Sequence, residues 1–300
     1  MRARAITDDD GDPISLDDMD RVRFVVAGPS TDFEEYWREN GGLDSVDNGD
    51  GTYSYTLENP IPADAEGSYG IGIEGRRVTD LDEEHTEVRD TAYNDVYYFA
   101  VTDSVAVPRR TIVSQENCDS CHEELSLHGG NRKNVEYCAF CHTPNENDSA
   151  ERAEENMPPV TIDLKYMVHR IHLGEEQDEP YILAGHGGSL IDFSEVRYPG
   201  DLRDCAKCHV DDSYTLPLDS DVLPTTVTHE GELISTTPPT TSVCASCHDS
   251  DATASHAEVM TTSDGSESCA VCHGEGKDSD VETVHSGIHY ADIVLEYSGT

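Results

Sequence analysis

The sequence has few basic residues and no long hydrophobic run. Its 300 residues include 19 lysines and arginines against 62 aspartates and glutamates, a formal net charge of −43. Nucleic acids and anionic membrane surfaces are therefore poor partners for this chain. No stretch approaches the ~18 consecutive apolar residues of a transmembrane helix. No signal-peptide pattern is visible at the start, where Met1–Ile6 runs into acidic residues.

The acidic excess also bears on the conditions in which the protein works. So many like charges repel one another unless dissolved salt screens them. The charge balance therefore favours a halophilic protein over an ordinary secreted acidic protein.

Cysteine is absent before position 118, and the ten cysteines beyond it fall into one repeated pattern. Five C-x-x-C-H motifs contain Cys118, Cys121 and His122; Cys138, Cys141 and His142; Cys205, Cys208 and His209; Cys244, Cys247 and His248; and Cys269, Cys272 and His273. This pattern attaches c-type haem: the two thiols form thioethers with the porphyrin, and the histidine binds the iron. Zinc ribbons and redox dithiols also use C-x-x-C, but neither requires the following histidine. The sequence predicts five covalently attached haem c groups.

The cysteine distribution predicts two domains, residues 1–107 and 108–300. The stretch Cys118–His273 has about 31 residues per motif, too few to build a protein core around each haem. We expect the porphyrins to supply much of the buried apolar surface of the second domain, and the domain not to fold without them.

The predicted fold class is α+β multidomain: an antiparallel β-domain, then a haem-packed pentahaem cytochrome c domain of short helices and long loops. In the first domain, short alternating segments separated by turns indicate strands in an antiparallel sandwich or barrel. These segments are Val22–Ala27, Thr52–Leu57, Tyr69–Ile73 and Asp95–Val101. In the second domain the clearest helix spans Asp163–Leu173 and stops at Gly174. Residues 210–243, rich in Thr, Pro and Asp, predict a long surface loop.

Nine histidines outside the motifs are available as second ligands of the five irons: His85, His128, His169, His172, His186, His229, His256, His285 and His289. His169 and His172, three residues apart on a helix, project from nearly the same face, so one helix would ligate two haems. We expect His128 and His256 to serve a haem other than that of the preceding motif. After the last motif, His285 is the nearer candidate.

The remaining histidines and methionines have simpler interpretations. His85, His186 and His229 are expected at the surface. Met157, Met167 and Met260 are alternative axial ligands, but packing is the better interpretation because enough histidines are present.

Several further runs are distinctive: Ile73–Arg77, Tyr98–Asp103, Leu127–Gly130, Met167–His172 and Asp192–Gly200. These runs resemble the OmcA/MtrC family, decahaem cytochromes of the bacterial outer surface. The resemblance covers nearly the whole chain but only half of a decahaem protein. It implies a Greek-key split barrel followed by a pentahaem domain with bis-histidine irons. By motif position it supports His128, His169, His172, His256 and His285 as distal ligands. The chain departs from the family in having five motifs, no visible lipid-anchor signal and no cysteine pair outside the motifs.

The predicted function is electron transfer through five closely packed bis-histidine haems, with no catalytic residue. The resemblance implies extracellular metal oxide, a soluble shuttle or another cytochrome as acceptor. The alternative is an enzyme, a multihaem reductase of a small oxyanion, which needs one open iron and nearby cationic groups. Because c-type haem is attached outside the cytoplasm, we expect an extracytoplasmic location. Association with a second multihaem half and self-association both stay open.

Overall fold

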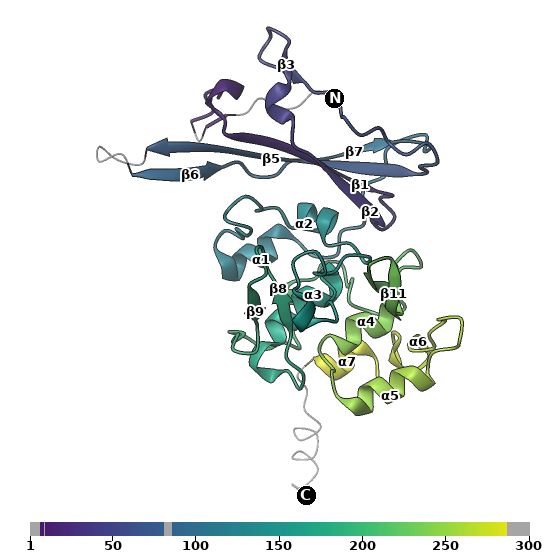
Figure 1. Cartoon of the computed structure of the whole chain (residues 1–300). Coiled ribbons are helices and arrows are strands. Elements are labelled where there is room, and N and C mark those ends of the chain that lie inside the picture. Colours follow the sequence, from purple (N-terminus) through teal and green to yellow (C-terminus); the bar gives the residue numbers. More distant parts are fainter. Residues whose placement is uncertain (1–6, 9, 81–85, 287–300) are drawn as a thin grey trace, which may run out of the picture. The chain divides into compact units, whose positions relative to one another are not determined.

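The computed structural model describes residues 7–8, 10–80 and 86–286 (Figure 1). It is a mixed α/β chain of antiparallel sheets and short helices, which confirms the predicted fold class at this coarse level. The chain forms two compact units: Met1–Arg110 with Cys118–Cys141, and Thr111–Asn117 with His142–Thr300. The cysteines of the first two motifs thus belong to the unit that contains the large sheet. The domain boundary at 107/108 stays a prediction, and His85 and His289 lie outside the described residues.

The first unit is built on one antiparallel sheet of order β2-β1-β5-β6, in which β7 also pairs with β5. Its strands are β1 (Arg21–Gly28), β2 (Glu35–Glu39), β3 (Val46–Asp47), β4 (Tyr53–Ser54), β5 (Ser68–Asp80), β6 (Glu87–Thr91) and β7 (Val96–Ala100). Its helical segments are η1 (Leu16–Asp18), η2 (Gly42–Asp44), the later part of α1 (Gln115–His122), and α2 (Val135–Cys141). The long strand β5 is central, because its start pairs with β7, its end with β6 and its other edge with β1.

The two faces of β5 have different packing partners. Tyr69 and Ile71 are buried in a cluster with Val26 of β1, as the predicted alternation requires. The opposite face carries Gly70 and Gly72. A Cβ on Gly70 would lie 2.5 Å from the Phe140 ring, and one on Gly72 would overlap the Tyr137 ring. The two glycines therefore let α2, with its buried aromatic side chains, approach the strand backbone closely.

The predicted strands of this unit are confirmed in part. Val22–Ala27, Tyr69–Ile73 and most of Asp95–Val101 lie in β1, β5 and β7. Thr52–Leu57 forms only the two-residue strand β4. Even so, Tyr53, Tyr55 and Leu57 pack against the same apolar side of the unit, and Tyr55 stacks on Phe24 at 5.0 Å. Strands β2 and β6 were not predicted because each contains several charged residues.

The second unit consists of short helices and two-stranded hairpins. Its helices are α3 (Leu164–Leu173), α4 (Pro239–Ala245), α5 (Asp251–Val259), α6 (Ala270–His273) and α7 (Val281–His285), with 3-10 turns η3 (Glu154–Asn156), η4 (Gly174–Glu176) and η5 (Cys205–Lys207). Its strands are β8 (Ile182–Ala184), β9 (Leu190–Asp192), β10 (Thr225–His229) and β11 (Glu232–Thr237). Among the residues that the structure describes, none of the helices is long and apolar enough to cross a membrane.

Helix α3 begins and ends where the sequence predicted. The Asp163 side chain caps its first turn by accepting from the Lys165 N–H. The chain leaves the helix at Gly174, whose φ is 50° and where a Cβ would overlap the Val196 carbonyl. This glycine is therefore required both by the backbone conformation and by the close approach.

The prediction of a loop over residues 210–243 is wrong. Residues 225–237 form the hairpin β10–β11, and α4 begins at Pro239. Thr225 and Val227 alternate inward and are buried, and the turn uses Glu230 and Gly231, which have positive φ. The β-branched alternation favoured a strand here, but the proline and threonine content concealed it.

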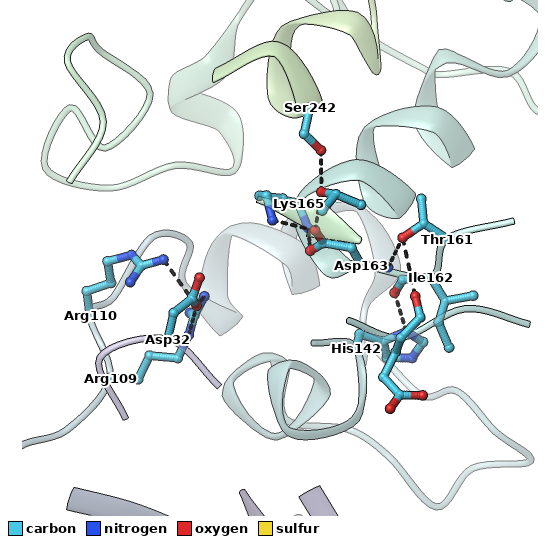
Figure 2. A network of polar contacts seen from close by, with 11 residues as sticks. Asp32, Arg109, Arg110, His142, Thr161, Ile162, Asp163, Lys165 and Ser242 are labelled. Atoms are coloured by element: carbon cyan, nitrogen blue, oxygen red, sulfur yellow. Dashed lines mark hydrogen bonds and ion pairs between the residues drawn. The ribbon is translucent and has the colours of Figure 1, made fainter. Parts of the chain in front are cut away.

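A buried polar network fastens this hairpin to two helices (Figure 2). The Thr225 hydroxyl lies 2.5 Å from Asp163 Oδ2 and 2.5 Å from the Ser242 hydroxyl of α4. Lys165 forms an ion pair with the same carboxylate. Asp163 thus caps α3 and also joins it to β10 and α4.

Candidate haem-binding sites

Three of the five motifs share one backbone turn. In each, the histidine N–H donates to the carbonyl of the first cysteine at 2.9 Å. These bonds join His209 to Cys205, His248 to Cys244 and His273 to Cys269. Residues three and four apart in such a turn lie on one side of the chain. Both thiols and the imidazole therefore leave the backbone together, as attachment of one flat macrocycle requires.

Three motif histidines lie opposite three histidines from outside the motifs. The ring centroids are 6.0 Å apart for His169 and His209, 6.2 Å for His256 and His273, and 5.9 Å for His248 and His285. An iron held by an imidazole nitrogen at about 2 Å on each side would set the centroids roughly 6 Å apart. Each pair has the spacing that one bis-histidine iron needs.

Burial disfavours the charged form of three of these histidines by lowering their pKa. Desolvation, and then repulsion from His169, lowers the pKa of His209 to about 4. Desolvation also lowers the pKa of His169. It is the first cause of the lowered pKa of His248, followed by the charges of His285 and His273. A neutral imidazole has a lone pair to donate to a metal.

Hydrogen bonds at Nδ1 set the orientation of several imidazoles. The Nδ1 atom of His142 lies 2.8 Å from the Ile162 carbonyl (Figure 2), and that of His172 lies 2.8 Å from the Val168 carbonyl. The Nδ1 atom of His273 lies 3.0 Å from the Ser279 carbonyl, and that of His285 lies 2.7 Å from the Val281 carbonyl. A carbonyl can only accept, so Nδ1 carries the proton in these four rings. The lone pair is then on Nε2, the atom left to bind a metal.

The structure places the remaining candidates in defined local environments. His128 has a φ of 53° in a turn where its carbonyl accepts from the Asn131 amide at 2.8 Å. The His172 ring meets Tyr198 edge-on at a centroid distance of 5.8 Å. That His122, His142, His128 and His172 are iron ligands stays a prediction.

Neighbouring motifs lie close enough for their thiols to influence one another. Burial is the main cause of the raised pKa of Cys138, Cys244 and Cys247. A cysteine of another motif raises each pKa further: Cys118 acts on Cys138, Cys269 on Cys244, and Cys205 on Cys247. Cys244 and Cys247 still touch solvent, so their desolvation comes from surrounding chain rather than from full enclosure. The first two motifs are thus neighbours, and so are the last three.

An ion pair that sequence reasoning missed joins α3 to the fourth motif. Arg170, between His169 and His172, is 2% exposed, and its Nη1 lies 2.5 Å from Asp249 Oδ2. Asp249 directly follows His248. The ion pair therefore holds α3, which carries two candidate ligands, against the fourth motif, whose His248 lies opposite His285 rather than opposite a histidine of α3. Arg170 lies in the family-like run Met167–His172, but Asp249 lies in none of these runs, so only the fold reveals the pair.

Two tyrosines beside candidate ligands were also missed. Tyr214 meets the His209 ring at 5.9 Å and 81°, as Tyr198 meets His172. Tyr198 lies in the family-like run Asp192–Gly200, which gave a signal. Tyr214 had none.

Comparisons with known proteins identify the family of the chain. The family described as outer membrane cytochrome MtrC/MtrF-like, domains II/IV, matches residues 110–286. Multiheme cytochrome MtrC of Shewanella baltica (strain OS185) is 33% identical over 105 residues, 33% of this chain and 16% of that protein. The crystal structure of MtrC from Shewanella baltica OS185 superposes with a TM-score of 0.56 at 15% identity, over 90% of this chain and 48% of that one. The chain thus spans about half the length of that structure.

The fold and the repeated haem motifs define a multihaem cytochrome. Because the family match covers more than half of the chain, the chain belongs to the MtrC/MtrF-like family of outer membrane cytochromes, which confirms the resemblance seen in the sequence. The crystal structure, at 15% identity, supports the fold alone.

Proposed function

We propose that the chain binds five haem c groups and passes electrons between them. The thioether cysteines are Cys118, Cys121, Cys138, Cys141, Cys205, Cys208, Cys244, Cys247, Cys269 and Cys272. The motif ligands are His122, His142, His209, His248 and His273, and the distal ligands are His128, His169, His172, His256 and His285. The observation that carries the proposal is the spacing of about 6 Å in three pairs, each joining a motif histidine to a distal candidate.

The residues of the chain fix the iron environment. Haem iron supplies one-electron chemistry, and two histidine ligands leave no open position and favour a low potential. The carbonyls at Nδ1 of His142, His172, His273 and His285 hold each ring in one tautomer and orientation. The proximity of thiols from neighbouring motifs supports closely spaced haems. These features suit electron transfer better than catalysis at an open iron.

The finer architecture is part of the same proposal. Residues 1–107 form a Greek-key split barrel, and residues 108–300 form a pentahaem domain, together equivalent to half of a decahaem protein. The antiparallel sheet around β5 and the match over 110–286 support this organisation.

The family relation guides the proposed location and partners. We place the protein outside the cytoplasm, because the matching family is named for outer membrane cytochromes. Its proposed partners are other cytochromes, redox shuttles or extracellular metal oxides, with a second multihaem half or a second copy as a further associate. The charge of −43 suits concentrated salt, where docking on an anionic surface is less opposed.

The test is a haem count combined with carbon monoxide binding to the reduced holoprotein. We expect five low-spin haems that do not respond to carbon monoxide. A response from about one haem in five in the unmodified protein would identify an open iron, and the reductase would replace electron transfer.

A variant makes the ligand assignment specific. His169→Ala should open one iron, so that about one haem in five binds carbon monoxide and added imidazole reverses the change. His186→Ala is the control, because the His186 side chain is fully exposed and should leave the spectrum unchanged. An unaltered spectrum of His169→Ala would contradict the pairing of His169 with His209.

A further inference from the structure

An arginine cluster lies on the face of β5 that packs against α2. Alternation along the strand puts Glu74 and Arg76 on the same face as the two glycines that admit α2. The register places Arg23 of β1 opposite Glu74 and Arg21 opposite Arg76. Arg132, from the segment between the first two motifs, adds a fourth guanidinium, with its Nη2 3.4 Å from Glu74 Oε1. Three of these four cations thus lie within 4 Å of one carboxylate.

The charges of this cluster are not balanced by the chain. Glu74 is 1% exposed and lies 3.8 Å from Arg21 and 3.9 Å from Arg23, longer than hydrogen bonds. Burial, and then the like charges of Arg23 and Arg76, lowers the pKa of Arg21. A chain with 19 basic residues and a net charge of −43 has concentrated four of them here. Grouping like charges in a partly buried site is unfavourable unless an anion joins them.

The same place contains unsatisfied polar atoms. Among the described residues, the buried Nε atoms of Arg21, Arg23, Arg76 and Arg132 have no hydrogen-bond partner, and neither do the Tyr137 hydroxyl and Glu74 Oε2. A buried donor left unpaired is destabilising. Carboxylate and phosphate oxygens are the acceptors that guanidinium groups bind best.

We propose that Arg21, Arg23, Arg76 and Arg132 form an anion site for carboxylate or phosphate-like groups, occupied by a haem propionate. The identity of the occupant rests on the proposed function, whereas the anion site itself does not. The chemistry is shared by a haem carboxylate and a free anion, and the experiment separates these sources.

Helix α2, which carries Cys138 and Cys141 of the second motif, packs on the same face of β5 as the cluster, with its Tyr137 ring against Gly72, two residues before Glu74. The cluster therefore lies beside a haem attachment point.

The experiment uses the holoprotein and its Arg132→Gln and Arg23→Gln variants. Phosphate is titrated calorimetrically at constant ionic strength, and the propionate bending bands are recorded by resonance Raman spectroscopy. The control is Arg77→Gln, since Arg77 neighbours Arg76 on β5 but points to the other face and pairs with Asp90 at 2.7 Å. It makes the same charge change outside the cluster.

The expected result is no phosphate binding to the unmodified holoprotein, with altered propionate bands in both cluster variants and unaltered bands in Arg77→Gln. Phosphate binding that Arg132→Gln weakens about tenfold, with propionate bands unchanged, would assign the site to a free anion instead. If phosphate does not bind and the bands do not change in either cluster variant, the anion site is refuted. The phosphate titration tests the anion site even if the protein is found to bind fewer than five haems.

Glu74→Gln separates an anion site from a structural role. It removes the one carboxylate inside the cluster, so it should raise the midpoint potential of one haem, whereas Arg132→Gln should lower it. A purely structural cluster would be loosened by both changes, and the two variants would then shift the potential in the same direction. That outcome would overturn the proposal even where a variant folds poorly.

Discussion

The two units differ in how their buried side chains are grouped. In the first, Val26, Tyr69 and Ile71 form an apolar cluster that the sheet encloses, and Phe140 adds a second contact on the opposite face. In the second, buried apolar side chains such as Tyr181 are accompanied by buried hydroxyls, the Asp163 carboxylate and the Arg170 guanidinium, while other apolar side chains such as Val271 stay exposed. The first unit thus has a core of its own side chains. The second arranges polar groups and histidines around haems that would complete its core.

Removing the haems should have the largest effect on the difference between the two units. In chain produced without covalent haem attachment, we expect residues 142–286 to lose protection from hydrogen exchange, because their apolar burial depends on porphyrin. The β1 and β5 amides should stay protected. Measuring exchange by mass spectrometry with and without haem decides the matter. Equal protection in the two units without haem would show that the second core does not need the porphyrins.

Breaking the ion pair of α3 should have the next largest effect. Arg170→Gln leaves Asp249 half-enclosed without its charge partner, and we expect a loss of about 3–5 kcal/mol in the second unit. Urea unfolding of the holoprotein followed at the Soret band measures it. The control is Arg197→Gln, whose pair with Glu175 at 3.0 Å is exposed on both sides and should cost less than about 1 kcal/mol. Equal losses in both variants would mean that burial of the pair does not matter.

Filling a glycine should weaken the first unit. Gly72→Ala places a methyl group on the Tyr137 ring, so α2 must move or the strand must bend. We expect a cost of about 1–3 kcal/mol, read from hydrogen exchange of the β5 amides. Gly75→Ala on the same strand is the matched control, because its Cβ would meet the flexible end of Met19 at 3.0 Å and the Ala92 Cβ at an ordinary contact distance of 3.6 Å. A larger loss in the control would mean that α2 does not depend on the glycines.

The accuracy of the sequence-based predictions differs between the two units, and the reason is physical. Strong local patterns were sufficient for β1, β5 and α3, where alternation or caps determine the element. The charged strands β2 and β6 were missed because neighbouring strands, rather than their own residues, make them extended. The hairpin over 225–237 was missed because composition outweighed its short alternation.

The candidate sites show the same division. The C-x-x-C-H spacing and the His169 and His172 pair are local patterns, so the sequence was enough to propose them. The pairing of His248 with His285, the Arg170–Asp249 bond and the arginines around Glu74 join residues far apart in the chain. No local pattern encodes such contacts, and they needed the fold.

The smallest expected effect tests a single carboxylate in the first unit. Glu39 is 1% exposed, and its oxygens accept from the Asn59 amide at 2.7 Å, the Asn59 and Glu58 N–H groups and the Tyr55 hydroxyl. Burial alone would raise its pKa, but these hydrogen bonds lower the pKa below its ordinary value. The stabilisation is therefore complete above the unfolded-state pKa of about 4.3 and is lost as the pH falls through the lower folded-state pKa.

Glu39→Gln should cost about 1 kcal/mol at neutral pH and remove this part of the acid sensitivity. Hydrogen exchange of the β1 and β2 amides between pH 3 and 6, compared with Glu66→Gln at an exposed position, measures the difference. If the two variants lose stability in parallel as the pH falls, Glu39 does not anchor the edge of the sheet. The acid response would then reflect the charge of the whole chain, and the first unit would depend on its surroundings as much as the second does.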